Sequence, residues 1–376
     1  MTLLLLICSN GLIDAERVVC SFSSAAINRP GENSFKLADI PLSLCTHVVY
    51  DYYFSFKLLS NHSELDAMDN GLQKFADLKR NKTDLKLLMR LPGPIFLEEA
   101  GKILIANILW FVDSMNVDGV ELLWVGGNEE ELYSFVEKLR SSFVAAGHPS
   151  KEVNFLAQID QRVFDHARLC RLVDYVHLFV TGERLPMYRA YSSTPTAKTT
   201  LDVGDVNYER ALDHYIEASC PANKIVLATV LAAQIYTLGI VENRDPPKEL
   251  STLCILTSGM CLCGYMKICP SFKENGWTFG WDDTEGLAPH AMQGNLWVAY
   301  ENEASVGRKG EIARIKQLAG VYVFSLEMDD YRGKCGSGLY PLTMALSRSF
   351  RGTAIDEEAT QIDLPINDDQ NGYDRN

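Results

Sequence analysis

Carboxylate side chains interrupt two apolar segments of the sequence. Carboxylates beside strand ends are groups that can act as general acids and bases in hydrolysis. The first segment, residues 117–127, carries Asp118 and Glu121. The second segment, residues 320–330, ends with Glu327, Asp329 and Asp330. Acid–base chemistry therefore has two candidate locations, and the elements around each must position its side chains.

Residues 117–127 are typical of a buried strand in a parallel sheet. The run is apolar and β-branched, begins with Asp-Gly and ends with Gly-Gly. Helical patterns precede it at about 97–116 and follow it at about 128–147. Positions 121, 123 and 125 share one face of this strand, and Trp124 points the other way, toward the helices. This order of elements predicts an α/β protein.

The alternation continues along the chain. We expect further strands at about 17–22, 47–56, 85–91, 153–159, 174–182, 221–228 and 320–330. We expect further helices at about 63–80 and 208–219, and a last helix at about 306–319. His47 and His177 fall in expected strands and are interpreted as core residues with satisfied hydrogen bonds. The 376 residues suffice for one large (β/α) barrel with an insertion or for two ordinary domains.

The 117–127 strand resembles the fourth-strand signature of the family 18 glycoside hydrolases, the chitinases, whose pattern is DGxDxDxE. Asp118 and Gly119 match this pattern, and Glu121 stands at its next acidic position. Leu123 and Val125 replace its last two acids, the second of which is the family's proton donor. The resemblance thus implies the family's fold together with the loss of its catalytic acid.

Further blocks between about 17 and 350 carry the same resemblance. Arg29-Pro30-Gly31, between Cys20 and Cys45, resembles the family's N-terminal block, in which the two cysteines form a disulfide. A second disulfide is implied between Cys269 and Cys335. The resemblance implies an α/β fold, a (β/α)8 TIM barrel with a small α+β insertion domain between strands 7 and 8, at about 235–294.

The family's chemistry depends on groups that this chain replaces. Family 18 enzymes use the N-acetyl oxygen of their own substrate as nucleophile, and they need one carboxyl group to protonate the leaving oxygen and a second to orient the acetamido group. The tyrosine that hydrogen-bonds the acetamido oxygen corresponds to Thr181. Sugar-facing aromatic residues of the family are replaced by Pro94, Ala232 and Phe324.

Glu121 does not compensate for these losses. It lies four residues before Val125, roughly 13 Å along the strand at about 3.3 Å per residue. A proton donor must come within about 3 Å of its acceptor. We therefore expect Glu121 to be a structural carboxylate buried in the barrel.

These replacements predict a non-hydrolytic chitinase-like protein that acts by binding a chitin-type glycan or a cell-surface or secreted protein. It would resemble the imaginal disc growth factors and the chitinase-like lectins. A lectin could use Phe324 together with Trp277 and Trp281 of the insertion, where Phe279 adds a further aromatic ring. A hydrolase that relocates its acids to Glu327, Asp329 or Asp330 is a third alternative.

The same replacements change the expected character of the open end of the barrel. If Leu123, Val125, Val180 and Phe324 line it, a pocket there would be apolar and would suit a hydrophobic ligand. Alternatively, neighbouring side chains fill the space.

The composition limits the partners and the compartment. The chain is 47% hydrophobic and 22% charged, with a net charge of −14, which argues against binding nucleic acids or anionic membranes. Residues 1–15 predict a secretory signal peptide, residues 16–351 the barrel, and residues 352–376 an acidic disordered tail. No other stretch is long and apolar enough to suggest a membrane span. A secreted, extracellular protein is expected.

Cysteines and sequons agree with this compartment. The chain has 10 cysteines, and the pairing of Cys170, Cys220, Cys254, Cys261 and Cys263 stays open. The crowded cysteines at 254–269 lack the second pair or the histidines of a zinc site, so we expect disulfides there, and neither a metal nor a cofactor. Asn61 and Asn81 begin N-glycosylation sequons.

Overall fold

The structure of the chain is a computed structural model. The structure describes residues 17–51, 70–92, 98–124, 128–158, 165–179, 199–201, 204–206, 208–237, 263–281 and 289–353. The expected signal peptide and nearly all of the expected acidic tail lie outside these residues.

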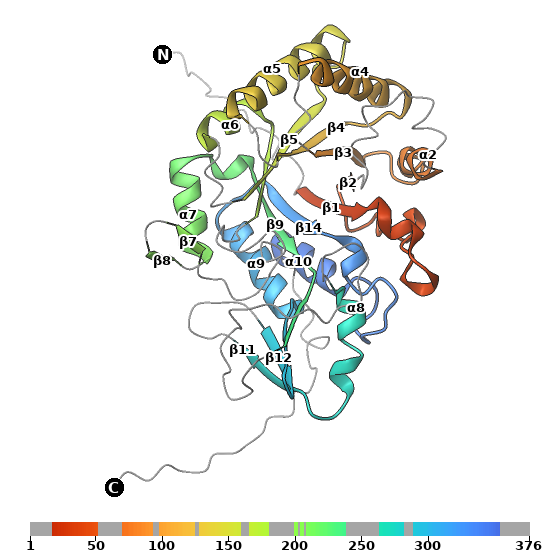
Figure 1. Ribbon diagram of the computed structural model, residues 1–376, viewed down its shortest axis with the longest axis vertical. Coiled ribbons are helices and arrows are strands. Elements are labelled where there is room, and N and C mark those ends of the chain that lie inside the picture. The colour runs from red at the N-terminus through yellow and green to blue at the C-terminus, as the bar shows by residue number, and fades with distance from the viewer. Residues whose placement is uncertain are drawn as a thin grey trace, which may run out of the picture.

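Eight parallel strands close into a barrel at the centre of the molecule (Figure 1). Their order around the barrel is β1-β14-β9-β6-β5-β4-β3-β2. Their bounds are β1 Arg17–Ser23, β2 His47–Asp51, β3 Lys86–Pro92, β4 Gly119–Leu123, β5 Glu152–Gln158, β6 Val176–Phe179, β9 Ile225–Val230 and β14 Gly320–Phe324. The predicted (β/α)8 TIM barrel is confirmed.

Helices surround the barrel (Figure 1). They are α2 Asn70–Ala76, α3 Leu78–Asn81, α4 Glu98–Ser114, α5 Glu129–Ala145, α6 His166–Leu172, α7 Tyr208–Ala218, α9 Glu303–Ile315 and α10 Pro341–Arg351. Capping fixes where several of them begin. Asn128 Oδ1 accepts the Glu130 amide at 2.9 Å at the start of α5, and Asn302 Oδ1 accepts the Ser305 amide at 2.9 Å at the start of α9.

Two expectations about the C-terminal helices were wrong. The helix expected at about 306–319 is α9, which begins earlier because Asn302 caps it and ends before Gln317, whose φ is +54°. It is not the last helix, since α10 follows β14 and begins with Pro341 at its first turn. Gly310 allows α9 and α10 to pack closely, because a Cβ there would lie 2.5 Å from Leu346 O.

Strand β4 shows how the sequence sets the two faces of the barrel wall. Its Gly119 faces β5 so closely that a Cβ would lie 2.2 Å from Glu152 O. Trp124, directly after the strand, is 2% exposed and packs in the core beneath the helices, as expected. Glu121 and Leu123 instead face the barrel interior.

A second, antiparallel sheet lies between barrel strands β9 and β14 in sequence. Its order is β10-β13-β12-β11, with β10 Gln234–Thr237, β11 Thr278–Trp281, β12 Pro289–Gln293 and β13 Leu296–Ala299. Helix α8, Tyr265–Ile268, belongs to the same segment. The predicted insertion bounds of about 235–294 omit β13, which returns from a tight turn at Gly294 (φ +58°). A small two-stranded sheet pairs β7 Thr199–Leu201 with β8 Gly204–Val206.

Disulfides connect distant parts of the described chain. Cys20 is bonded to Cys45 and Cys269 to Cys335, the two pairs that the family resemblance implies. Cys170 is bonded to Cys220, which answers one pairing left open by the sequence. Cys263 is also disulfide-bonded. Among the described helices, none has both the length and the apolar character needed to cross a membrane.

Candidate functional site

The carboxyl ends of the barrel strands meet in an apolar cluster, called the barrel mouth here. It consists of Leu123, Phe179, Val230, Ala232, Phe324 and Met328. The rings of Phe179 and Phe324 meet edge to face, with centroids 5.2 Å apart. Leu123, Phe324 and Met328 are partly exposed, while the other members are buried. Apolar side chains from strands β4, β6, β9 and β14 thus gather at this end of the barrel.

Beneath the mouth lies a polar cluster, called the Arg90 network here. It is formed by the buried residues Arg90, Glu121, His177 and Tyr322 and by the partly exposed Asp51. Arg90 Nε donates to Glu121 Oε2 at 2.5 Å, and Arg90 NH1 donates to Asp51 Oδ2 at 2.5 Å. The second terminal nitrogen of Arg90 donates to the Tyr322 hydroxyl. The guanidinium is also 5.0 Å from the centroid of the Phe324 ring. One buried cation therefore joins strands β2, β3, β4 and β14 below the mouth.

Glu121 is the carboxylate at the centre of this network. It is fully buried, its Oε1 lies 2.5 Å from His177 Nδ1, and its Oε2 accepts from the Tyr322 hydroxyl at 3.3 Å. Burial alone would raise the pKa of Glu121, but the Arg90 guanidinium and His177 lower it to about 2. A carboxyl group with this pKa stays ionised near neutral pH, so Glu121 cannot serve as a general acid there.

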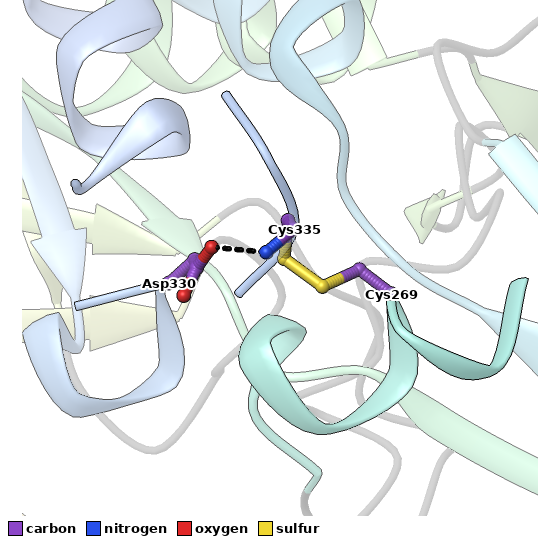
Figure 2. Close-up of side chains that lie close together, drawn as sticks. All are labelled: Cys269, Asp330 and Cys335. Carbon is purple, nitrogen blue, oxygen red and sulfur yellow. Dashed lines mark hydrogen bonds between the residues drawn. A yellow bond between two sulfur atoms is a disulfide. The ribbon is translucent and has the colours of Figure 1, made fainter. Parts of the chain in front are cut away.

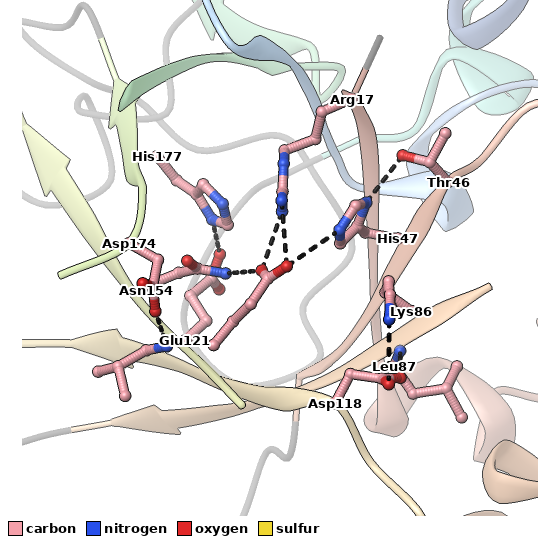
Figure 3. A network of polar contacts seen from close by, with 12 residues as sticks. Arg17, Thr46, His47, Lys86, Leu87, Asp118, Glu121, Asn154, Asp174 and His177 are labelled. Atoms are coloured by element: carbon pink, nitrogen blue, oxygen red, sulfur yellow. Dashed lines mark hydrogen bonds and ion pairs between the residues drawn. The ribbon is translucent and has the colours of Figure 1, made fainter. Parts of the chain in front are cut away.

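A second polar cluster, the Glu152 network, lies at the amino ends of the strands (Figure 3). Arg17 donates two hydrogen bonds to Glu152, at 2.9 and 3.0 Å, and Asn154 Nδ2 donates a third at 2.9 Å. His47 Nε2 lies 3.5 Å from Glu152, and its Nδ1 lies 2.8 Å from Thr46 Oγ1. Burial lowers the pKa of His47. These contacts close the end of the barrel opposite the mouth.

The three acids that follow β14 are buried and engaged in structural contacts. Asp329 accepts from the Thr343 amide and hydroxyl at 2.8 and 2.7 Å, at the start of α10, and burial raises its pKa to about 6. Asp330 accepts the amides of Lys334 and Cys335 at 2.9 and 2.6 Å. Glu327 is 4% exposed and accepts the Ser23 amide at 3.3 Å.

Asp330 also lies beside two cysteine sulfurs, an arrangement that resembles a metal site (Figure 2). The sulfurs of Cys269 and Cys335 are bonded to each other, so neither is a thiolate that could bind a metal. The Asp330 carboxylate instead accepts backbone amides of the loop that carries Cys335. The grouping is a loop anchor.

The expected sugar-binding aromatics do not form one cluster in the described structure. Phe324 lies in the barrel mouth, whereas Trp277 lies directly before β11, partly buried and edge to face with Phe272 at 5.1 Å. Phe279 is 39% exposed and packs against Phe272 at 5.4 Å. Trp281 lies in β11, and its side chain is outside the described part of the chain.

Several expected positions fall outside the described residues. They are Pro94, Val125, Val180, Thr181 and the sequon residue Asn61. The other sequon residue, Asn81, is exposed at the end of α3.

Arg90 is a residue of the candidate site that the sequence analysis did not identify. The signal was present, because Arg90 interrupts the apolar run 85–91 and shares the inward parity of Leu88. A lone charge on the inward face of a buried strand requires a buried partner. The sequence alone does not identify that partner as Glu121.

Comparison with known proteins places the chain in a family. The model of the family described as glycosyl hydrolases family 18 matches residues 17–329, so the chain belongs to this family. The chain is 25% identical to the endochitinase of Manduca sexta, in an alignment that covers 93% of this chain and 70% of the relative.

Solved structures share the fold. A group IV chitinase of Ostrinia furnacalis superposes with a TM-score of 0.74 at 24% identity, covering 89% of this chain and 100% of the other. Human YKL-39, described as a pseudo-chitinase with retained chitooligosaccharide binding properties, superposes with a TM-score of 0.72 at 22% identity, covering 90% and 100%. The proteins that share this fold thus include one named as a chitinase and one named as a pseudo-chitinase.

Proposed function

We propose that this protein is a non-hydrolytic member of family 18 that binds a chitin-type glycan or a protein partner. The observation that carries the proposal is the pair Leu123 and Val125, at the positions where the family signature has its last two acids. Neither side chain can donate a proton. Loss of a general acid alone typically reduces a rate by about 10²–10⁴-fold.

The contacts of Glu121 support this proposal. It is the one acidic residue within β4, it is fully buried, and its pKa of about 2 keeps it ionised. Arg90 and His177 hold both of its oxygens below the mouth. Glu121 is therefore suited to stabilising the barrel and unsuited to protonating a leaving group.

The contacts of the acids after β14 argue against relocated catalysis. Asp329 and Asp330 accept hydrogen bonds that hold the start of α10 and the 334–335 loop. Burial raises the pKa of Glu327, a property that a general acid needs. However, its Oε2 is buried and shielded from solvent.

A glycan is the favoured partner. YKL-39 is a pseudo-chitinase that retains chitooligosaccharide binding, and it shares this chain's fold. The partly exposed ring of Phe324 at the mouth offers an apolar face of the kind that ligand sites use. Trp277, directly before β11, and Trp281, at the end of β11, are secondary candidates. A secreted or cell-surface protein is the alternative partner.

We further propose that the protein is secreted. The apolar residues 1–15 have the character of a signal peptide, and the described residues contain three complete disulfides. Disulfides of this kind persist in oxidising compartments.

The test is a chitin-bead pull-down of the purified protein, with hydrolysis of chito-oligosaccharides assayed on the same sample. Binding without turnover is the expected result. Absence of both would leave the protein-partner alternative, and binding to the proteins of a cell-surface fraction would then be measured. Turnover above the buffer blank, abolished by Glu327→Gln, would refute the non-hydrolytic proposal and identify Glu327 as a relocated acid.

A further inference from the structure

The Arg90 network presents one carboxylate to the solvent at the barrel mouth. Asp51 is the last residue of β2, and 31% of its side chain is exposed, whereas Arg90 and Glu121 are 1% and 0% exposed. Its Oδ2 accepts from Arg90 NH1 at 2.5 Å. Within the described part of the chain this is the one hydrogen bond of its side chain, and it engages Oδ2 rather than Oδ1.

The charge of Asp51 is only partly offset. Arg90 directs Nε to Glu121 and its second terminal nitrogen to Tyr322, which leaves NH1 for Asp51. Two carboxylates therefore share one guanidinium. A carboxylate that is partly removed from water and shares its counter-charge attracts a cation more strongly than a fully solvated one does.

An aromatic ring lies on the same guanidinium. The Phe324 ring centroid is 5.0 Å from Arg90 Cζ, and Phe324 is partly exposed at the mouth. Asp51 and Phe324 thus contact the same guanidinium group. An ammonium group placed there would gain both a charge-assisted hydrogen bond and contact with an aromatic ring.

The rest of the protein favours the same sign of ligand. The chain carries a net charge of −14, which raises the local concentration of polycations and repels polyanions. On β4, Leu123 stands where the family signature has the carboxylate that orients the acetamido group. The mouth therefore has an acceptor for an ammonium group and lacks this acceptor for an acetamido group.

We propose that the barrel mouth recognises amino sugars with a free ammonium group, as in oligomers of β-1,4-linked glucosamine, with Asp51 as the specificity-determining residue. This inference rests on the proposed glycan binding and names the chemical class of the glycan. The Asp51 carboxylate accepts the ammonium group, and the Phe324 ring packs against the sugar.

The experiment is calorimetric titration of the full chain with glucosamine tetramer and with N-acetylglucosamine tetramer, in slightly acidic buffer that keeps the sugar amines protonated. The glucosamine tetramer should bind about 10-fold more tightly, as expected for one charge-assisted hydrogen bond. Asp51→Asn should remove this preference and leave the affinity for the acetylated tetramer unchanged.

Asp213→Asn is the matched control. Like Asp51, Asp213 is a partly exposed carboxylate that pairs with a cationic side chain, in this case Lys316 at 2.5 Å. Asp213 lies on helix α7, outside the barrel. Both substitutions remove one negative charge, so a purely long-range attraction would respond equally to each. Only Asp51→Asn should weaken binding of the glucosamine tetramer.

The comparison of the two tetramers needs no variant and stays informative if Asp51→Asn does not fold. Tighter or equal binding of the acetylated tetramer would overturn this inference and leave the proposed glycan binding intact. Equal losses in Asp51→Asn and Asp213→Asn would overturn the role of Asp51. Binding of neither tetramer would overturn both this inference and the glycan form of the proposed function.

Discussion

Arg90 and Glu121 face each other in register on neighbouring strands β3 and β4, and their side chains form an ion pair of 2.5 Å inside the barrel. Neither side chain is exposed by more than 1%. Burying one charge is costly unless a partner compensates it, so the two residues depend on each other. This pair lies directly below the mouth, where Arg90 hydrogen-bonds Asp51 and contacts the ring of Phe324.

Removal of one member of this pair should destabilise the fold strongly. We expect Arg90→Met to lower the free energy of unfolding by about 3–5 kcal/mol, because it leaves Glu121 buried without its main counter-charge. Urea denaturation followed by circular dichroism would measure the change. The double variant Arg90→Met/Glu121→Leu should recover part of the loss, since it removes both charges.

An exposed ion pair is the control. Arg168 pairs with Glu130 at 2.5 Å, with side chains 37% and 61% exposed. Arg168→Met should cost no more than about 1 kcal/mol. Equal losses of the free energy of unfolding in Arg90→Met and Arg168→Met would show that the buried ion pair stabilises the fold no more than the exposed one.

The pKa of Glu121 predicts a defined acid sensitivity. Its pKa is about 2 in the folded protein and 4.5 as the ordinary value, so its ionised form stabilises the fold above pH 4.5. That contribution, about 3 kcal/mol, is lost as the pH falls from 4.5 toward 2. Glu121→Gln should therefore be less stable than the wild type at neutral pH, and this difference should shrink over that interval. A difference that stays constant with pH would contradict the assignment.

The contribution of Asp329 to stability should depend on pH in the opposite direction to that of Glu121. Burial raises its pKa to about 6 from an ordinary value of 3.8, so its contribution to stability is complete below 3.8 and is lost as the pH rises through 6. Asp329→Asn keeps the size of the side chain and does not titrate. Its stability relative to the wild type should therefore improve between pH 4 and about 6, as denaturation curves at several pH values would show.

The sequence predicted the α/β alternation because its signals are local or repeated, whereas the closed (β/α)8 barrel was expected from the family resemblance. The alternation of strands and helices, and the parity of positions 121, 123 and 124, follow from the period of a strand and can be read within ten residues. The burial of Glu121 was predicted on this ground. Burial in the structure confirms this parity, since Glu121 and Trp124 lie on opposite faces of the barrel wall.

The remaining features depend on contacts between distant segments. Arg90 meets Asp51 and Tyr322 across sequence separations of 39 and 232 residues, and no local pattern encodes such pairings. The role of Asp329 was missed for a similar reason, because it depends on α10, an element that the sequence analysis did not identify. Asp329 and Asp330 suggested acid–base chemistry in the sequence, whereas their hydrogen bonds hold the start of α10 and the 334–335 loop.

The Cys170–Cys220 disulfide should be a major source of stability. It closes a loop of 50 residues of sequence separation, for which chain-entropy arguments give about 4 kcal/mol. We expect Cys170→Ser/Cys220→Ser to lower the free energy of unfolding by roughly that amount. Peptide mapping without reduction should recover the linked peptides from the wild type, and recovery of either cysteine in another pair would contradict the connectivity.

Asn81 should carry an N-linked glycan when the protein passes through a eukaryotic secretory pathway. Asn81 and Thr83 of the sequon are both exposed, at the end of α3 and the turn that leads into β3. The turn lies at the amino end of β3, so a glycan there would project from the face opposite the barrel mouth and leave the mouth accessible.

Treatment with a glycosidase that removes N-glycans should lower the mass of the secreted protein. Asn81→Gln and Thr83→Ala should remove this mass difference at that site, while Thr83→Ser should keep it, because serine also completes the sequon. Asn61→Gln in the same background separates the contribution of the second sequon. A secreted protein whose Asn81 peptide is unmodified would contradict the prediction, and unchanged binding of glycan after deglycosylation is expected because the two faces are separate.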